Sequence, residues 1–142
     1  MGITKKKMLY VQTRGMKTPD RLYSPFIFAM TAKAMDLDAS IFFLGEGITV
    51  LKKGEAENLD SAISFLKAGA GEDSSELQQL ERIPSLRKLI EQSINAGVKL
   101  YVCDQSRNLL DLKETDFIEE AEIAGAATLN DLALEADGDM WL

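Results

Sequence analysis

Residues 98–106 read Val-Lys-Leu-Tyr-Val-Cys-Asp-Gln-Ser, and this stretch decides the fold predicted for the chain. Its first five residues are mostly β-forming and apolar, which is typical of a buried strand. Gly97 ends the helix predicted before the strand, and Ser106 is a residue type that caps the start of a helix. Cys103 is therefore expected at the carboxyl end of a strand, the edge at which open α/β sheets bind their ligands.

Cys103 has two interpretations from its position alone. A free cysteine is among the most buried residue types and usually packs as a small apolar side chain. At the carboxyl end of a parallel strand the same thiol could instead carry chemistry. Position alone favours the structural interpretation slightly.

The length of 142 residues indicates one domain over residues 1–142, long enough to bury a core without a disulfide or metal. No apolar run approaches the length of a membrane span. The basic start of the chain is followed by an apolar run of only Met8 to Val11, which is too short for the core of a signal peptide. We therefore expect a soluble cytoplasmic protein without membrane contact.

The content of ionisable and metal-binding residues excludes several classes of function. With one cysteine and no histidine, a single chain can form neither a disulfide, nor a Cys/His zinc site, nor a Ser-His-Asp or Cys-His pair. We expect no cofactor and no metal. The net charge of −7 argues against nucleic acid as a partner, because its phosphates require a basic surface.

Strands and helices are predicted to alternate along the chain. The predicted strands cover residues 7–13, 39–44, 98–103, 122–124 and 139–142. The apolar character of residues 7–13 and 39–44 indicates burial on both faces, which is the mark of a parallel sheet covered by helices. We predict an α/β three-layer sandwich with a mostly parallel sheet of about five strands.

Helix starts are predicted from capping residues. Thr18 with Pro19 matches a helix N-terminus, although Pro25 should kink that helix or restart it from Ser24. Ser85 is expected to cap another helix. Thr128 with Asp131 matches a capping box for a helix that runs to residue 135. Short helices are also predicted at residues 48–53, 59–67, 76–81, 106–110 and 114–120.

Residues 54–83 differ from the rest because they are rich in turn-forming and acidic residues. We interpret them as an insertion that lies over the sheet edge. The insertion could cover a site as a lid, contact another subunit, or be a plain surface excursion, and the last is favoured.

Polar residues and glycines follow three of the predicted strands, and we expect them to form a pocket at the strand ends. The candidate binding residues are Arg14, Gly15, Gly45, Glu46, Asp104 and Ser106. The sequence Gly45-Glu46-Gly47 allows unusual backbone angles but completes no phosphate-binding motif.

A series of short segments, in a fixed order along the chain, resembles the sequences of a known family. The segments are Thr13-Arg14-Gly15, Pro19-Asp20-Arg21, Phe42 to Gly47, Ala96 to Cys103, Leu112, Glu122 to Gly125 and Leu129 to Leu132. Together they resemble the DsrE/TusD sulfur-relay family, over nearly the whole chain except residues 54–83. No single motif carries the resemblance, which rests on the run of segments in this order.

The resemblance implies a DsrE-like α/β fold and assembly into homo- or hetero-oligomers, often trimers or hexamers. Members with a cysteine at the position of Cys103 are taken to carry sulfur there as a persulfide and to pass it to another thiol. The implied function is a sulfur carrier or sulfurtransferase with donor and acceptor proteins as partners, and whether the chain is itself an enzyme is left open. Some members lack the cysteine and serve as structural subunits.

Sulfur transfer would require the thiolate of Cys103, since a free thiol is mostly protonated at neutral pH. A helix N-terminus near Ser106 and the positive charge of Arg14 would favour the thiolate. The carboxylates of Asp104 and Glu46 would oppose it. Glu46 is more readily expected to accept hydrogen bonds from the backbone of the neighbouring loop.

Two other functions remain open from the sequence. The chain could be a non-catalytic oligomeric subunit with a buried, inert Cys103. It could also bind a small ligand of the nucleotide type at the Gly45-Glu46-Gly47 loop and the strand ends, although no phosphate-binding loop is complete.

Overall fold

The computed structural model describes residues 5–142, so that residues 1–4 of the expected single domain lie outside the described residues. Five strands form one parallel sheet in the order β4-β3-β2-β1-β5. They are β1 (Lys7–Gln12), β2 (Asp38–Phe43), β3 (Lys99–Cys103), β4 (Ala121–Ala124) and β5 (Gly138–Trp141). The predicted strands are confirmed, and the sheet is parallel throughout.

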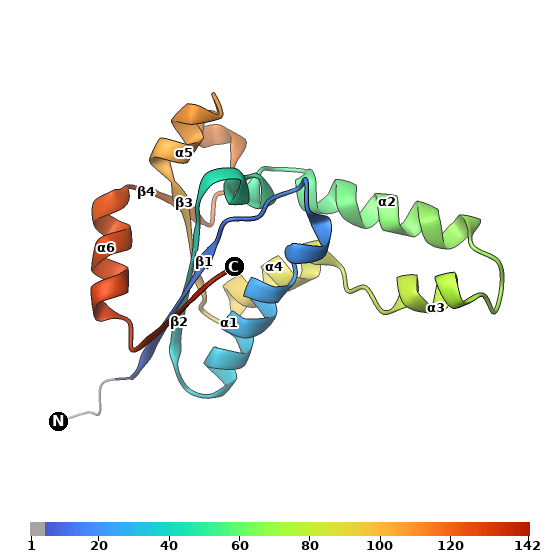
Figure 1. The fold of residues 1–142 in the computed structure, drawn as a ribbon, viewed down its shortest axis with the longest axis horizontal. Helices are drawn as coiled ribbons and strands as arrows, with labels where there is room; N and C mark the ends of the chain where they lie inside the picture. Colours follow the sequence, from blue (N-terminus) through green and yellow to red (C-terminus); the bar gives the residue numbers. More distant parts are fainter. Residues whose placement is uncertain (1–4) are drawn as a thin grey trace.

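Helices cover both faces of this sheet (Figure 1). On one face lie α1 (Ser24–Ala34) and α4 (Leu86–Asn95), and on the other lies α6 (Ala126–Glu135). The chain steps in one direction from β1 to β4 and then returns to the far side of β1 with β5. Since crossovers between parallel strands are right-handed, the return connection places its helix on the opposite face. The predicted three-layer α/β architecture is confirmed.

The apolar residues of the three central strands β1, β2 and β3 are buried on both faces of the sheet, whereas those of the edge strand β5 are largely exposed. Phe43 packs on Phe26 of α1, with their ring centroids 5.9 Å apart. Phe42 points to the other face and stacks on Tyr101 of β3 at 6.0 Å. This two-sided burial explains why the strands are continuous apolar runs in the sequence.

The first α-helix begins later in the chain than the predicted N-cap at Thr18. Residues Pro19–Arg21 form only the short 3₁₀ helix η1, and α1 begins at Ser24. Thr18 caps no helix with its side chain, because its hydroxyl donates to the carbonyl oxygen of Gly15 at 3.3 Å. The restart that Pro25 predicted is therefore confirmed, with proline in the first turn of α1, where its missing N–H costs nothing.

Two other predicted caps are wrong. Helix α5 (Asp104–Leu109) begins two residues before Ser106, and Cys103 is its N-cap. Helix α6 begins after Gly125, without any side-chain cap, so Thr128 lies inside its first turn. Further short 3₁₀ helices are η2 (Gly45–Leu51) and η3 (Glu114–Asp116).

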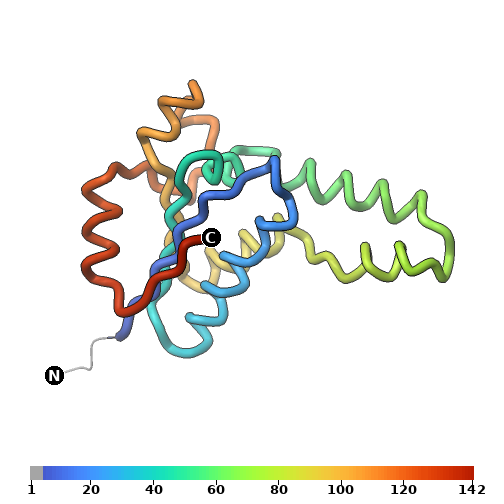
Figure 2. The backbone as a smooth tube through the Cα atoms, in the orientation of Figure 1, coloured from blue at the N-terminus to red at the C-terminus, as the bar shows by residue number. Residues whose placement is uncertain are grey.

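The insertion predicted at residues 54–83 is a helical hairpin of α2 (Glu55–Gly69) and α3 (Ser75–Glu81). It projects away from the sheet rather than lying over its edge (Figure 2). Its base is anchored by Asp60, whose carboxylate accepts hydrogen bonds from Ser85 and from the first backbone N–H groups of α4. On α2 the side chains of Phe65 and Leu66 are exposed.

Candidate functional site

The thiol of Cys103 lies where β3 ends and α5 begins. The residue is 6% exposed and is the N-cap of α5. Its Sγ accepts a hydrogen bond from the backbone N–H of Ser106 at 3.5 Å. An N–H group at the start of a helix favours negative charge on the atom that it faces. The local backbone therefore supplies the sulfur with a hydrogen-bond donor.

Ser106 ties the thiol segment to the end of the neighbouring strand. Its hydroxyl oxygen accepts the backbone N–H of Gly45 at 2.8 Å, immediately after β2. Gly45 has φ +59°, a left-handed conformation that glycine adopts without strain. Ser106 therefore does not cap α5 with its side chain, and its hydroxyl instead joins two strand ends.

Asp104 is paired with a cation that the sequence analysis did not select. The Nε and Nη2 groups of Arg107 donate to one carboxylate oxygen of Asp104 at 2.9 and 2.7 Å. The same guanidinium group donates through Nη1 to the carbonyl oxygen of Leu112 at 2.8 Å. The carboxylate beside Cys103 is thus compensated by a fixed positive charge. The spacing of three residues on a helix could have indicated the pair.

Glu46 and Gly15 lie next to each other in the loops that follow β2 and β1. The carboxylate of Glu46 accepts the backbone N–H of Lys17 at 3.1 Å, and Thr49 links the same two loops through its hydroxyl. A Cβ on Gly15 would clash with the backbone of Glu46. Protein atoms therefore fill the space around these two residues, which hold the loops together.

Arg14 lies beyond the end of β1, and β2 separates that strand from β3 and Cys103. It lines a different hollow together with Arg21. The residues that were expected to form one pocket thus lie in three separate groups. Cys103, Asp104, Ser106 and Gly45 form one group, Gly15 and Glu46 a second, and Arg14 belongs to a third.

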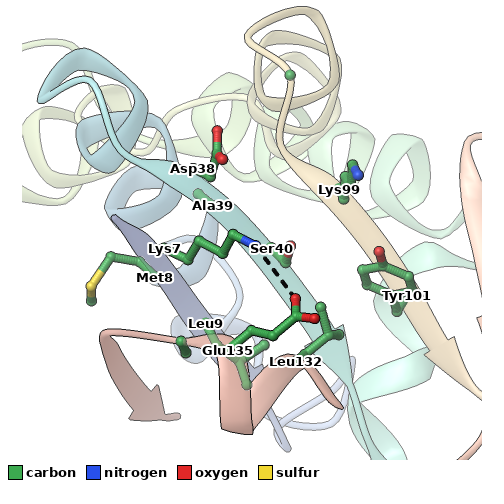
Figure 3. A pocket seen from close by; sticks show the side chains of 12 residues that line it. Lys7, Met8, Leu9, Asp38, Ala39, Ser40, Lys99, Tyr101, Leu132 and Glu135 are labelled. Carbon is green, nitrogen blue, oxygen red and sulfur yellow. Dashed lines mark hydrogen bonds and ion pairs between the residues drawn. The ribbon is translucent and has the colours of Figure 1, made fainter. Parts of the chain in front are cut away.

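A more enclosed hollow of about 210 Å³ lies at the opposite, amino edge of the sheet, under α6 (Figure 3). Lys7 and Glu135 form an ion pair of 3.4 Å across it. Burial raises the pKa of Tyr101 in its wall above the usual value, and Glu122 and Glu135 add to this rise. The hollow is lined mainly by early residues of β1, β2 and β3 and by residues of α6, and Cys103 is not among them.

Within residues 5–142 no group of three or more Cys, Asp or Glu side chains is placed to hold a metal ion. None of the helices described there combines the length and apolar character needed to cross a bilayer.

Replacing Arg107 by glutamine is expected to lower the free energy of unfolding by about 1–2 kcal/mol, because the bond to Leu112 is lost as well as the ion pair. Asp104→Asn removes only the ion pair, whose carboxylate is 43% exposed, and is expected to cost about 0.5 kcal/mol. Urea unfolding of both variants measures the two costs. A larger loss for Asp104→Asn would show that Arg107 is not the anchor of this turn.

Comparison with known proteins gives a match over nearly the whole chain. The model of the DsrE/DsrF-like family matches residues 6–140. The sulfur carrier protein DsrE2 of Allochromatium vinosum is 27% identical over 153 residues, which cover 93% of this chain and 95% of that protein. An uncharacterized protein of Methanocaldococcus jannaschii is 28% identical over 143 residues, but the chain spans only 45% of its length.

Solved structures share the fold. The ychN protein from E. coli superposes with a TM-score of 0.70 at 14% identity, covering 96% of this chain and 99% of that one. A protein of unknown function from Methanobacterium thermoautotrophicum gives a TM-score of 0.60 at 11% identity, covering 98% and 100%. At these identities the likeness concerns the arrangement of helices and strands.

Proposed function

The chain belongs to the DsrE/DsrF-like family, and on this basis we propose that it is a sulfur carrier that accepts sulfur as a persulfide on Cys103 and passes it to a partner thiol. The name of the relative from Allochromatium vinosum, a sulfur carrier protein, supports a role in sulfur relay.

The single observation that carries the proposal is the position of the only cysteine. Cys103 ends β3 at the carboxyl edge of a parallel sheet and receives an N–H hydrogen bond on its sulfur. Arg107 pairs with the adjacent carboxylate of Asp104 at 2.7 Å. These features support sulfur chemistry on Cys103.

The transfer can be written with one thiol on this chain. The thiolate of Cys103 attacks the terminal sulfur of a donor persulfide R–S–SH, a new S–S bond forms, and the donor leaves as R–S⁻. An acceptor thiolate then attacks the terminal sulfur of the persulfide on Cys103, which leaves as a thiolate. Each step forms one S–S bond and breaks one, so no external oxidant or reductant is needed.

Approach of a protein donor to the thiol requires a shift of α5, because Cys103 is only 6% exposed. The helix that it caps carries Leu109 with 79% of its surface exposed, followed by Leu110 with 44%. Apolar side chains of this kind favour contact with another protein. We propose donor and acceptor proteins that dock beside α5 and shift it.

We further propose that the chain works in the cytoplasm, where thiols remain reduced, and assembles into a homo-oligomer of three or six copies. Light scattering on the purified protein would give the number of copies. A monomer at all concentrations would contradict the oligomer without bearing on sulfur transfer.

Exposure to a persulfide donor is expected to add the mass of one sulfur atom to the native protein and none to Cys103→Ser. The reason is that the chain contains no other thiol. Intact-mass spectrometry measures the adduct, and a reductant should remove it because it is bound as a persulfide. Ser93→Ala is a suitable control, since Ser93 is buried in α4 and leaves the thiol in place. No adduct on the folded protein would contradict the carrier function.

A second candidate function is a non-catalytic oligomeric subunit with an inert Cys103, and the burial of that residue favours it. In this case a thiol reagent would label the protein only after unfolding. Rapid labelling of the folded protein would exclude the inert subunit.

A further inference from the structure

We infer that a hollow at the carboxyl ends of β1 and β5 binds a small organic anion, with its phosphate or carboxylate group on Arg14 and Arg21 and its flat part against Trp141. The hollow has a volume of about 370 Å³. It is lined by Thr13, Arg14, Arg21, Ser24, Trp141 and Leu142. Its volume lies within the range of about 300–1,000 Å³ that small-molecule sites occupy.

The place of the hollow in the sheet favours ligand binding. From β1 the strands are added in one direction as far as β4, and β5 then joins the opposite side of β1. The direction of winding therefore reverses between β1 and β5. In open parallel sheets, ligands bind in the crevice outside the carboxyl ends of the strands at this reversal. Cys103, at the end of β3, is not at the reversal.

The charges at the hollow favour an anion, although the chain carries a net charge of −7. Among the described residues that line it, none has an acidic side chain. Arg14 makes no ion pair with any residue in the range 5–142, and Arg21 has only a loose contact of 3.7 Å with the exposed Asp20. Guanidinium groups bind phosphates and carboxylates through paired N–H groups.

The start of α1 adds to this positive field. Ser24, the first residue of this 11-residue helix, lines the hollow, and no side chain caps the helix. The positive end of the helix dipole at an N-terminus favours a negative ligand.

The two arginines extend from fixed backbone positions. Gln12 is fully buried at the end of β1, and its Nε2 group donates to the carbonyl oxygen of Arg14 at 2.7 Å and to that of Arg21 at 3.1 Å. Because both partners are acceptors, the amide nitrogen must face them. One side chain thus holds the loop of Arg14 and the segment of Arg21 together.

Trp141 supplies a flat apolar wall. Its indole N–H donates to the carboxylate of Asp139 at 3.1 Å, which orients the ring, and the residue is 58% exposed. An exposed tryptophan ring stacks well on aromatic bases. The combination of a cationic end and an aromatic wall fits a ligand with an anionic group attached to a ring.

Because Trp141 is the only tryptophan, its fluorescence reports on this hollow alone. We expect AMP to change the fluorescence in a saturable way, inorganic phosphate to compete with it, and adenosine to bind more weakly than AMP. Arg14→Gln and Arg21→Gln should each weaken AMP binding about tenfold or more, as the loss of a charged hydrogen bond does. Added salt should weaken it as well.

Arg82→Gln is the matched control, since Arg82 is an exposed arginine on the helical hairpin, away from the hollow. It should leave AMP binding unchanged. Absence of any fluorescence change or heat of binding with AMP and phosphate would overturn the inference. So would AMP binding that survives both arginine substitutions, or adenosine binding as tightly as AMP. The result is independent of sulfur uptake, because the loss of Cys103 leaves the hollow intact.

Discussion

Replacement of Gly47 by alanine is expected to lower the free energy of unfolding by roughly 3 kcal/mol or more. A Cβ at this position would clash with the carbonyl oxygen of Gln12 and lie 2.9 Å from its carbonyl carbon. Both atoms belong to the backbone at the end of β1, which cannot turn aside as a flexible side chain could. The loop after β2 would have to move away from β1, and the contacts of Glu46 would be lost with it.

Urea unfolding followed by circular dichroism measures this loss. Gly69→Ala is the matched control, because Gly69 is the last residue of α2 and a Cβ there meets no atom within 4 Å. Alanine is a better helix former than glycine, so this control should be neutral or slightly stabilising. Equal stability of Gly47→Ala and the wild type would show that the strand ends are not closely packed.

Replacement of Gln12 by glutamate is expected to destabilise the fold by at least about 3 kcal/mol near neutral pH. The new carboxylate would face the carbonyl oxygens of Arg14 and Arg21, which accept hydrogen bonds and cannot donate them. The site is fully buried, so water cannot solvate the charge. The folded state therefore favours the protonated carboxyl, and its pKa rises above the unfolded value.

The pH dependence follows from the sign of this shift. Where the folded pKa is raised, the folded state holds the extra proton, and stability falls as the pH increases above about 4.3. The deficit of Gln12→Glu against the wild type should therefore grow by up to about 1.4 kcal/mol per pH unit between mildly acidic and neutral pH. Gln12→Met, of similar size, loses the same hydrogen bonds without a charge. Its deficit should be smaller and independent of pH, and a deficit of Gln12→Glu that shrinks with rising pH would contradict this account.

The three central strands β1, β2 and β3 could be predicted because each is largely an apolar run that is buried in the sheet. Residues 7–13, 39–44 and 98–103 were expected, and β1, β2 and β3 lie within one residue of those bounds. In a parallel sheet covered on both faces the sequence pattern and the burial pattern coincide. No long-range information is needed to find such strands.

Helix starts were harder to predict, since a capping side chain has several possible partners. The hydroxyl of Thr18 donates to Gly15, and that of Ser106 accepts from Gly45, which comes from another strand end. Neither hydroxyl is used by the helix that it was expected to cap. The tertiary structure determines which partner each hydroxyl bonds, and a local sequence pattern carries no information about that structure.

The surroundings of Cys103 were predicted in part. The residues adjacent in sequence, Asp104 and Ser106, lie beside it, while Arg14 lies beyond β1. The hollow that Arg21 and Trp141 share could not be predicted, because it depends on the pairing of β1 with β5, whose residues are separated by more than a hundred positions.

That pairing has a consequence for how the chain folds as it is synthesised. The pair β1 and β2 can form early, but the other edge of β1 remains unpaired until residues 138–141 leave the ribosome. During this interval the open edge could bind a strand from another copy. Once β5 has paired, the backbone N–H and the hydroxyl of Thr13 both donate hydrogen bonds to the carbonyl oxygen of Leu142. A ligand held by both Arg14 and Trp141 would bind only the closed sheet and would therefore oppose its reopening.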